Sequence, residues 1–460
     1  IQKQAAMKRT GLHWLAISVL LIAASSANAD TRPQYGGTLH IAMTMSASSL
    51  DPAEMSDSVG ARNLVALIFD TLVTVDATGR PQSALAESWQ TVRGDRGLEF
   101  HLRRNVKFHD GSPLTAEITA SSLRRGNPAW NVTVTGDTVT IETAASTPEL
   151  LQEVALFRNG IAKRDASGMM SGTGPFHIVE WQAAKHLVLA ANEDYWNGRP
   201  FVDEIDVDMG RNFRDQMNAL ESGRADLVEV APEQMHRAVS QRYELLRSSP
   251  IELIALKFAK EAASAQEKAS RDALRLSIER QSMHNVLLQG AGQSTASLLP
   301  TWMSGYGFVF STQPDRSRAQ QVRDQIPGVP SFALGYDSND PLARLLAERI
   351  ALNARDAGLS VQLNASATEL RVVRIPLASW DPWTSLLVLN NQLSLPPIEV
   401  KAHSLEQLFA SEQSMLASGR IIPLFHLPVA YAAGTNLHNW TVMPGGKLNL
   451  ASAWLKSSQS

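Results

Sequence analysis

The chain has 460 residues, a formal net charge of −3 at pH 7 and no cysteine. This mild acidity argues against a nucleic-acid partner and against a basic face for anionic membranes. Without cysteine the chain has no disulfide, no thiolate chemistry and no cysteine-based metal site. Its length exceeds what one hydrophobic core usually holds, so we expect at least two lobes.

Residues 1–29 have the three parts of a secretory signal peptide in the right order. Lys8 and Arg9 supply positive charge, and the apolar stretch after them is too short to anchor stably in a bilayer. Residues 27–29, Ala-Asn-Ala, fit a cleavage site. We expect cleavage before Asp30 and release without a lipid, because no cysteine is available to carry one. A buried N-terminal helix is the alternative.

The next elements follow from residue periodicity and turn chemistry. Apolar and polar residues alternate over 38–45 and 98–102, which predicts two strands. Residues 59–72 fit a helix. Residues 131–143 predict a hairpin that turns at Gly136-Asp137, because glycine adopts the positive φ of a two-residue turn.

The C-terminal half contains the best delimited helix of the chain. Asp340 suits the N-cap, Pro341 the first helical position and Gly358 the stop. Strand-like segments flank this helix at 332–336 and 359–363, so we expect a β-α-β unit. A further amphipathic helix is predicted over residues 271–288. The chain is therefore predicted to be α/β.

Residues 107–117, KFHDGSPLTAE, predict a tight turn followed by a helix that Thr115 caps. His109 and Asp110 could be taken for a catalytic dyad. We disfavour that hypothesis, because adjacent turn residues rarely converge on one substrate and no nucleophile accompanies them.

Residues 172–176, GTGPF, lack the third glycine and the Lys-Ser or Lys-Thr pair of a phosphate-binding loop. Two strands follow instead, at 177–181 and 186–190, and then Asn192–Trp196, NEDYW. The aromatic pair that ends this segment is expected to seal a turn against the core, with stacking on a ligand as the alternative.

In order and spacing these blocks resemble the family 5 extracellular solute-binding proteins, the dipeptide/oligopeptide-binding receptors of bacterial ABC importers. The resemblance extends from Gly36 to Leu424. It implies the α/β fold of a type II periplasmic binding protein, with two main lobes, a hinge and an additional smaller lobe. Residues 123–129 are compressed where relatives carry a longer excursion, so the small lobe is expected to be reduced.

The resemblance implies three lobes with these boundaries. The first comprises residues 35–51, 171–254 and 426–460, the reduced second comprises 52–170, and the third comprises 255–425. The ligand is expected between the first and third lobes, where hinge closure buries it.

Residues 379–383, SWDPW, resemble a shortened form of the family segment that binds the α-ammonium of a peptide. Asp381 lies between Trp380 and Trp383, where exclusion of water would strengthen its pairing with a cation. The alternative is that Asp381 caps a helix that starts at Pro382. The two roles are compatible.

The glycine-rich segment Gly172, Thr173 and Gly174 is the second candidate for ligand contact. In the family it is where the chain crosses back into the first lobe, close to the ligand. Glycine permits close backbone approach there. A plain inter-lobe turn is the alternative.

We therefore predict a periplasmic substrate-binding protein of an ABC importer that captures a small solute. A peptide is the first candidate for this solute. It would deliver the solute to an inner-membrane permease and ATPase, as a monomer with no catalytic residue, metal or cofactor. One alternative is a secreted hydrolase whose pair of catalytic carboxylates is not marked by any sequence motif. Another is a sensory or chaperone-like periplasmic binder on the same fold. Intact co-purified solute would argue against the hydrolase, and a neighbouring permease gene against the sensory binder.

Overall fold

The computed structural model describes residues 32–92, 96–144, 149–400 and 402–456. The predicted signal peptide and its cleavage site lie outside the described residues. Within these ranges, no helix has both the length and the apolar character that crossing a membrane requires.

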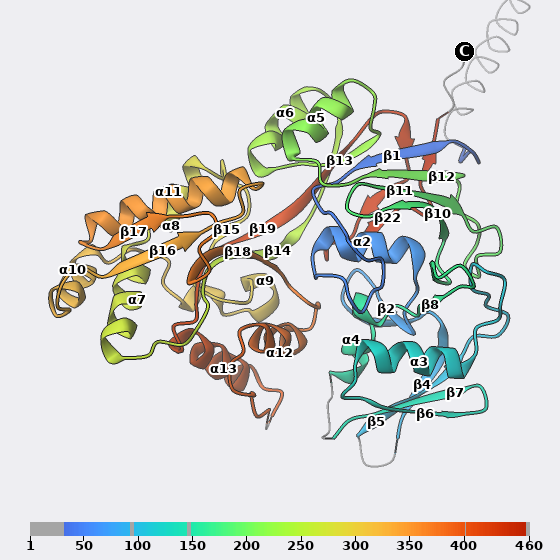
Figure 1. Cartoon of the computed structure of the whole chain (residues 1–460), viewed down its shortest axis with the longest axis horizontal. Helices are drawn as coiled ribbons and strands as arrows, with labels where there is room; N and C mark the ends of the chain where they lie inside the picture. Colours follow the sequence, from blue (N-terminus) through green and yellow to red (C-terminus); the bar gives the residue numbers. More distant parts are fainter. Residues whose placement is uncertain (1–31, 93–95, 145–148, 401, 457–460) are drawn as a thin grey trace, which may run out of the picture.

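One sheet of 11 strands runs through both larger parts of the molecule (Figure 1). Its order is β10-β11-β12-β1-β13-β19-β14-β18-β16-β17, and β15 pairs with β19. The strands are β1 (Thr38–Ala42), β10 (Phe176–Gln182), β11 (His186–Ala191), β12 (Glu204–Asp208), β13 (Leu227–Glu229), β14 (Glu244–Phe258), β15 (Gln293–Ser294), β16 (Ser331–Gly335), β17 (Ser360–Leu363), β18 (Leu370–Pro376) and β19 (Ile421–Ala433).

The long antiparallel strands β14 and β19 join the two halves of this sheet. β19 also pairs with β13 on one side, and β14 pairs with β18 on the other. Their mutual register shifts around Pro250, where the chain has no N–H to donate to the ladder. Irregular pairing bends strands locally, so this pair of strands is a natural hinge between the two halves.

We call the half built on β1 and β10 to β13 the first lobe. β1 pairs in parallel with β12 and β13. On one face lies α2 (Val59–Ile68), whose Leu64 and Ile68 share a buried core with Leu39 of β1. α2 begins at Ser58, whose hydroxyl accepts the N–H of Ala61. The helix ends earlier than predicted, because Phe69 already has extended backbone. α5 (Phe213–Glu221) and α6 (Met235–Ser240) contribute to a core with other residues of this sheet.

The second lobe is built on an antiparallel sheet in the order β4-β5-β7-β6. Its reduction relative to the family stays a prediction. The predicted hairpin is confirmed: β6 and β7 turn at Gly136, where φ is +58°. Thr115 caps α3, also as predicted. The elements of this lobe are β2 (Val73–Val75), β3 (Pro81–Ser83), β4 (Ala86–Thr91), β5 (Gly97–Leu102), α3 (Ala116–Gly126), β6 (Asn131–Thr135), β7 (Thr138–Glu142), α4 (Leu150–Val154) and the 3-10 helix η2 (Phe157–Asn159). The short pair β8 (Lys163–Arg164) and β9 (Met170–Ser171) follows them.

The third lobe, the half built on β16 to β18, contains the predicted β-α-β unit. β16 and β17 are parallel, and α11 (Pro341–Asp356) connects them. The Asp340 carboxylate accepts the N–H groups of Leu342 and Ala343, which confirms the predicted cap. The residue boundaries proposed for the three lobes stay a prediction. They assigned α2 to the second lobe, whereas in the structure α2 shares the buried core of β1 in the first lobe.

The prediction of a single helix over residues 271–288 is wrong. Two helices are present, α7 (Ala265–Ser277) and α8 (Arg280–Val286), because Ile278 has extended backbone and is fully buried. Helical periodicity continues across the break, so the residue pattern did not reveal it.

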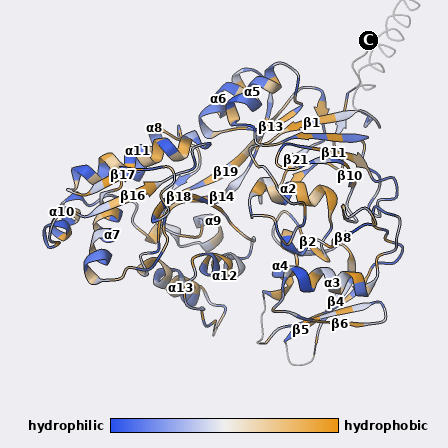
Figure 2. Ribbon diagram, in the orientation of Figure 1, coloured by the Kyte–Doolittle hydropathy of each residue, from blue (hydrophilic) through white to orange (hydrophobic). Residues whose placement is uncertain are grey.

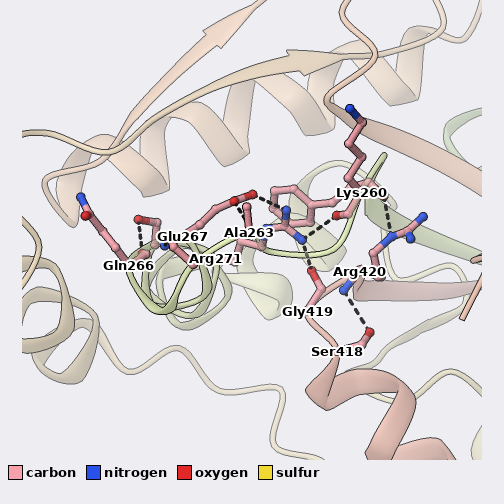
Figure 3. Close-up of polar contacts among 11 residues, drawn as sticks. Lys260, Ala263, Gln266, Glu267, Arg271, Ser418, Gly419 and Arg420 are labelled. Atoms are coloured by element: carbon pink, nitrogen blue, oxygen red, sulfur yellow. Dashed lines mark hydrogen bonds and ion pairs between the residues drawn. The ribbon is translucent and has the colours of Figure 1, made fainter. Parts of the chain in front are cut away.

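Arg271 of α7 fastens this helix to the end of the central strands (Figure 3). Its guanidinium donates to the carbonyls of Lys260 and Gly419, each at 3.0 Å, and pairs with Glu267. It also lies over the ring of Phe258, 4.0 Å from the centroid. The charge is thus buried with partners on several sides, which favours one position of α7.

Other helices complete the third lobe: α9 (Thr301–Ser304), η4 (Gly307–Val309), α10 (Arg316–Asp324), α12 (Pro382–Gln392) and α13 (Leu405–Ala417). Figure 2 shows that the hydrophobic residues lie mainly along the strands and on the helix faces turned to them. Separate buried cores on the two faces of the third lobe contain Leu346 of α11 and Leu386 of α12.

Candidate ligand-binding site

Residues 109–111, His-Asp-Gly, and residues 172–174, Gly-Thr-Gly (the GTG segment), pack together through the ring of His109. Its Nδ1 accepts the N–H of Gly172 at 3.2 Å, and its Nε2 lies 3.0 Å from the carbonyl oxygen of Gly174. The ring is therefore neutral with its hydrogen on Nε2, because Nδ1 acts as an acceptor. Burial lowers the pKa of His109 to about 4. Asp110 instead pairs with Lys163 at 2.6 Å, so the two adjacent residues serve separate structural contacts.

Gly172 and Gly174 lie against the C-terminal end of α2. A Cβ atom at Gly172 would be 2.1 Å from the carbonyl oxygen of Ile68, and one at Gly174 would be 2.5 Å from its carbonyl carbon. The N–H of Gly174 donates to that same oxygen at 3.0 Å. The close backbone approach expected of these glycines is present, and it is to a helix end.

Three side chains from the GTG and NEDYW segments converge on the carboxylate of Asp70. The Thr173 hydroxyl and the Trp196 indole N–H donate to Oδ2 at 3.0 and 2.8 Å, and the Tyr195 hydroxyl donates to Oδ1 at 3.1 Å. Burial raises the pKa of Asp70, and these hydrogen bonds offset part of that effect. Motifs that are about a hundred residues from Asp70 thus hold one carboxylate in place.

Asp70 lies on the wall of a cavity of about 880 Å³, which we call cavity A. All three lobes contribute to it: α2 from the first, the segment around Gln152 from the second, and α9 with residues 377–380 from the third. A cavity of this size and mixed lining is typical of a small-molecule site.

Trp380 forms the part of the wall where the three lobes meet. Its ring lies 4.8 Å from that of Trp302, edge to face. A Cβ atom at Gly79 in the second lobe would be 2.4 Å from Cβ of Trp380. One at Gly445, near the C-terminus, would be 2.6 Å from its Nε1. Polar contacts cross the same boundary, since Arg62 donates to the Leu377 carbonyl at 2.6 Å.

Of the six residues proposed first for ligand contact, Trp380 lines cavity A, and so do Tyr195 and Trp196, for which stacking on a ligand was the alternative. Asp381 is the N-cap of α12, and its Oδ2 accepts the N–H and the hydroxyl of Thr384 at 2.6 and 2.9 Å. Trp383 is 5% exposed and packs in a core of the third lobe. Residues 172–174 face α2 and Asp70. Ligand contact by these residues stays a prediction, and the cap at Asp381 is present.

Sequence reasoning missed two basic residues on the cavity wall, Lys447 and Arg158. Within the described part of the chain, neither side chain makes a hydrogen bond or an ion pair. The other basic residues on the wall are engaged. Arg62 pairs with Asp57 at 2.7 Å, and Arg103 donates to the Ala84 carbonyl at 3.0 Å. Arg199 pairs with Glu193 and Asp203 at 2.8 and 2.6 Å. No local pattern marks a residue as unpaired, so no signal in the sequence could have found these two.

A second cavity, of about 1150 Å³, lies where β1, β12 and β13 end, opposite the N-terminus of α11. Most of its charges are matched within the protein. Arg374 pairs with both Glu252 and Asp340, at 2.9 and 3.0 Å. Glu229 accepts the N–H and the hydroxyl of Thr44, each at 2.6 Å. Across the described ranges, no group of three or more His, Asp or Glu residues could hold a metal ion.

Residues 80–382 match the family model of the bacterial extracellular solute-binding proteins, family 5, middle part. This match covers more than half of the chain. The chain belongs to this family. Its relatives in family 5 are solute-binding proteins, which are not enzymes.

Two relatives illustrate the sequence similarity. The nickel-binding protein NikA of Staphylococcus aureus is 26% identical over 280 residues, which are 57% of this chain and 55% of NikA. The probable ABC transporter periplasmic-binding protein SapA of Escherichia coli is 24% identical over 323 residues, 59% of each chain. The chain thus covers less than two thirds of the length of both relatives.

The fold is that of type II periplasmic binding proteins. A dipeptide-binding protein from Pseudoalteromonas sp. SM9913, solved in complex with Met-Leu, superposes with a TM-score of 0.80. The two chains are 16% identical, and the superposition covers 91% of this chain and 100% of the other. The architecture expected from the motifs, α/β with lobes joined at a hinge, is therefore confirmed.

Proposed function

We propose that this family 5 protein is the solute receptor of an ABC importer and that it closes its lobes over one small solute in cavity A. Relatives named for nickel binding and for an ABC transporter support a role in uptake. The observation that carries the proposal is the convergence of three lobes at Trp380, because a solute touching all three favours the closed arrangement. An inner-membrane permease and its ATPase are the proposed partners.

A peptide remains the solute class that we propose. The aromatic wall of Trp380 and Trp302 can cover an apolar side chain. Extended peptides are also bound largely through backbone hydrogen bonds, which need few dedicated side chains.

Secretion is part of the proposal. We expect N-terminal sequencing of protein from a periplasmic extract to begin at Asp30, with no lipid attached. A membrane-bound protein that retains residues 1–29 would contradict this location.

Native mass spectrometry of protein purified without denaturation tests the receptor role. We expect one bound solute of low mass that unfolding releases intact, and we expect it to raise the melting temperature when added back. Trp380→Ala should lose the adduct, whereas the same change at the half-exposed Trp181, outside cavity A, should retain it. Release of a chemically altered product, or failure of every solute tested to raise the melting temperature, would contradict a receptor.

A further inference from the structure

Among the described residues, five cationic side chains and two carboxylates line cavity A. Asp57 is neutralised by Arg62 in a two-pronged ion pair, at 2.7 and 2.9 Å. Both oxygens of Asp70 already accept hydrogen bonds from neutral donors. Lys447 and Arg158 are the cations on the wall without such partners among the described residues. Such a cavity attracts negative charge, because the field of cations that line a concave surface is focused into it.

Lys447 is held in place by the chain on both sides of it. The Asn63 side chain, which is buried, donates to the carbonyl of Gly446 at 3.0 Å and accepts the N–H of Leu448 at 2.9 Å. Asn63 thereby grips the residues before and after Lys447. A backbone fixed in this way loses little entropy when the ammonium binds a ligand.

The environment of the Lys447 ammonium supports the same conclusion. Burial lowers its pKa, and the charge of Asp70 compensates only in part. An anion beside it would favour the charged form.

Arg158 is fixed by the turn that carries it. Asn159, which is buried, donates to the carbonyl of Glu153 at 2.6 Å, and the N–H of Gly160 donates to the carbonyl of Phe157 at 3.0 Å. Lys447 near the C-terminus and Arg158 of the second lobe thus line one cavity from two lobes. An anion that contacts both would link these lobes.

We propose that the solute carries an acidic oxygen group, a carboxylate or a phosphate, which Lys447 and Arg158 bind in cavity A. This rests on the proposed receptor function and names the ligand chemistry of that site. For a peptide, it assigns recognition to the C-terminal carboxylate. The alternative is recognition of the α-ammonium by Asp381, whose Oδ2 already serves the first turn of α12.

The test measures binding affinities by calorimetry. The probes are Met-Leu, its C-terminal amide, N-acetyl-Met-Leu and inorganic phosphate. We expect the amide to bind about tenfold or more weakly than the free dipeptide, because it lacks the charge-assisted contact. The acetylated form should bind nearly as well as the free dipeptide. Lys447→Met should reduce the preference for the free acid over the amide. Two control variants should preserve this preference: Lys268→Met, at an exposed position of α7, and Asp381→Asn.

The preference for acid over amide separates a binding role of Lys447 from a structural one. If Lys447 only balances Asp70, the methionine variant melts at a different temperature while its acid-to-amide ratio stays that of the wild type, which overturns the proposal. If phosphate binds tightly, no dipeptide binds, and Lys447→Met loses the phosphate, the proposal holds with a phosphate as the acidic group of the solute.

If no probe binds, the chemical nature of the solute that stays bound through non-denaturing purification tests the inference. A solute with an acidic group that Lys447→Met no longer retains supports the inference. A neutral or cationic solute overturns it and leaves the receptor function standing. Absence of any bound solute overturns both.

Discussion

Gly172→Ala is expected to lower the free energy of unfolding by more than about 3 kcal/mol, or to prevent folding. The added methyl group would lie 2.1 Å from the Ile68 carbonyl oxygen and 2.6 Å from the ring of Phe69. Overpacking usually costs about 1–3 kcal/mol when side chains can yield, and here a helix end must move instead. The shift would also disturb Asp70, two residues beyond Ile68, and with it one wall of cavity A.

Gly136→Ala is the control for a generic glycine effect. Gly136 has a φ of +58°, and a methyl group added there would have no atom within 4 Å, so alanine meets backbone strain alone. We expect a cost of about 1 kcal/mol for it in urea unfolding. Similar costs for the two variants would contradict the close packing at Gly172.

Acid is expected to destabilise the protein through His109 by about 2–3 kcal/mol between pH 6.5 and pH 4. Its folded-state pKa, about 4, lies below the ordinary value of 6.5. The folded protein therefore binds fewer protons than the unfolded chain in this window. The stability contributed by the neutral ring is complete above pH 6.5 and is lost as the pH falls toward 4. The figure follows from about 1.4 kcal/mol per pH unit, reduced for partial exposure of the ring.

His109→Gln supplies the comparison, because glutamine can accept from Gly172 and donate to Gly174 without titrating. Its stability should fall less between pH 6.5 and pH 4 than that of the wild type. His177, whose ring lies 6.1 Å away and whose pKa burial also lowers, stays in both proteins, as does Asp110. Parallel curves for wild type and His109→Gln would show that His109 does not titrate in this range.

Much of the fold was predictable because its cues are local. The cap at Asp340, the turn at Gly136 and the alternation in β5 each act within a few residues. The break at Ile278 was not predictable. Burial of that side chain in a core built from distant parts of the chain outweighs a helical pattern that continues across it.

The candidate site was less accessible from sequence. The glycine-rich segment was recognised, but its contact is with Ile68, about a hundred residues earlier. Trp380 and Asp381 were taken as one unit, yet the helix that starts at Pro382 directs the carboxylate to its own first turn. Lys447 and Arg158 share a cavity only because the chain crosses between lobes several times.

The distance between the second and third lobes tests the central claim most directly. Since the chain has no cysteine, spin labels can be attached at Thr135→Cys on β6 and Ser317→Cys on α10 alone. Electron paramagnetic resonance should give a broad distribution without solute. A solute that raises the melting temperature should give one narrow, short distance. An unchanged distribution at saturation with such a solute would contradict closure of the lobes over cavity A.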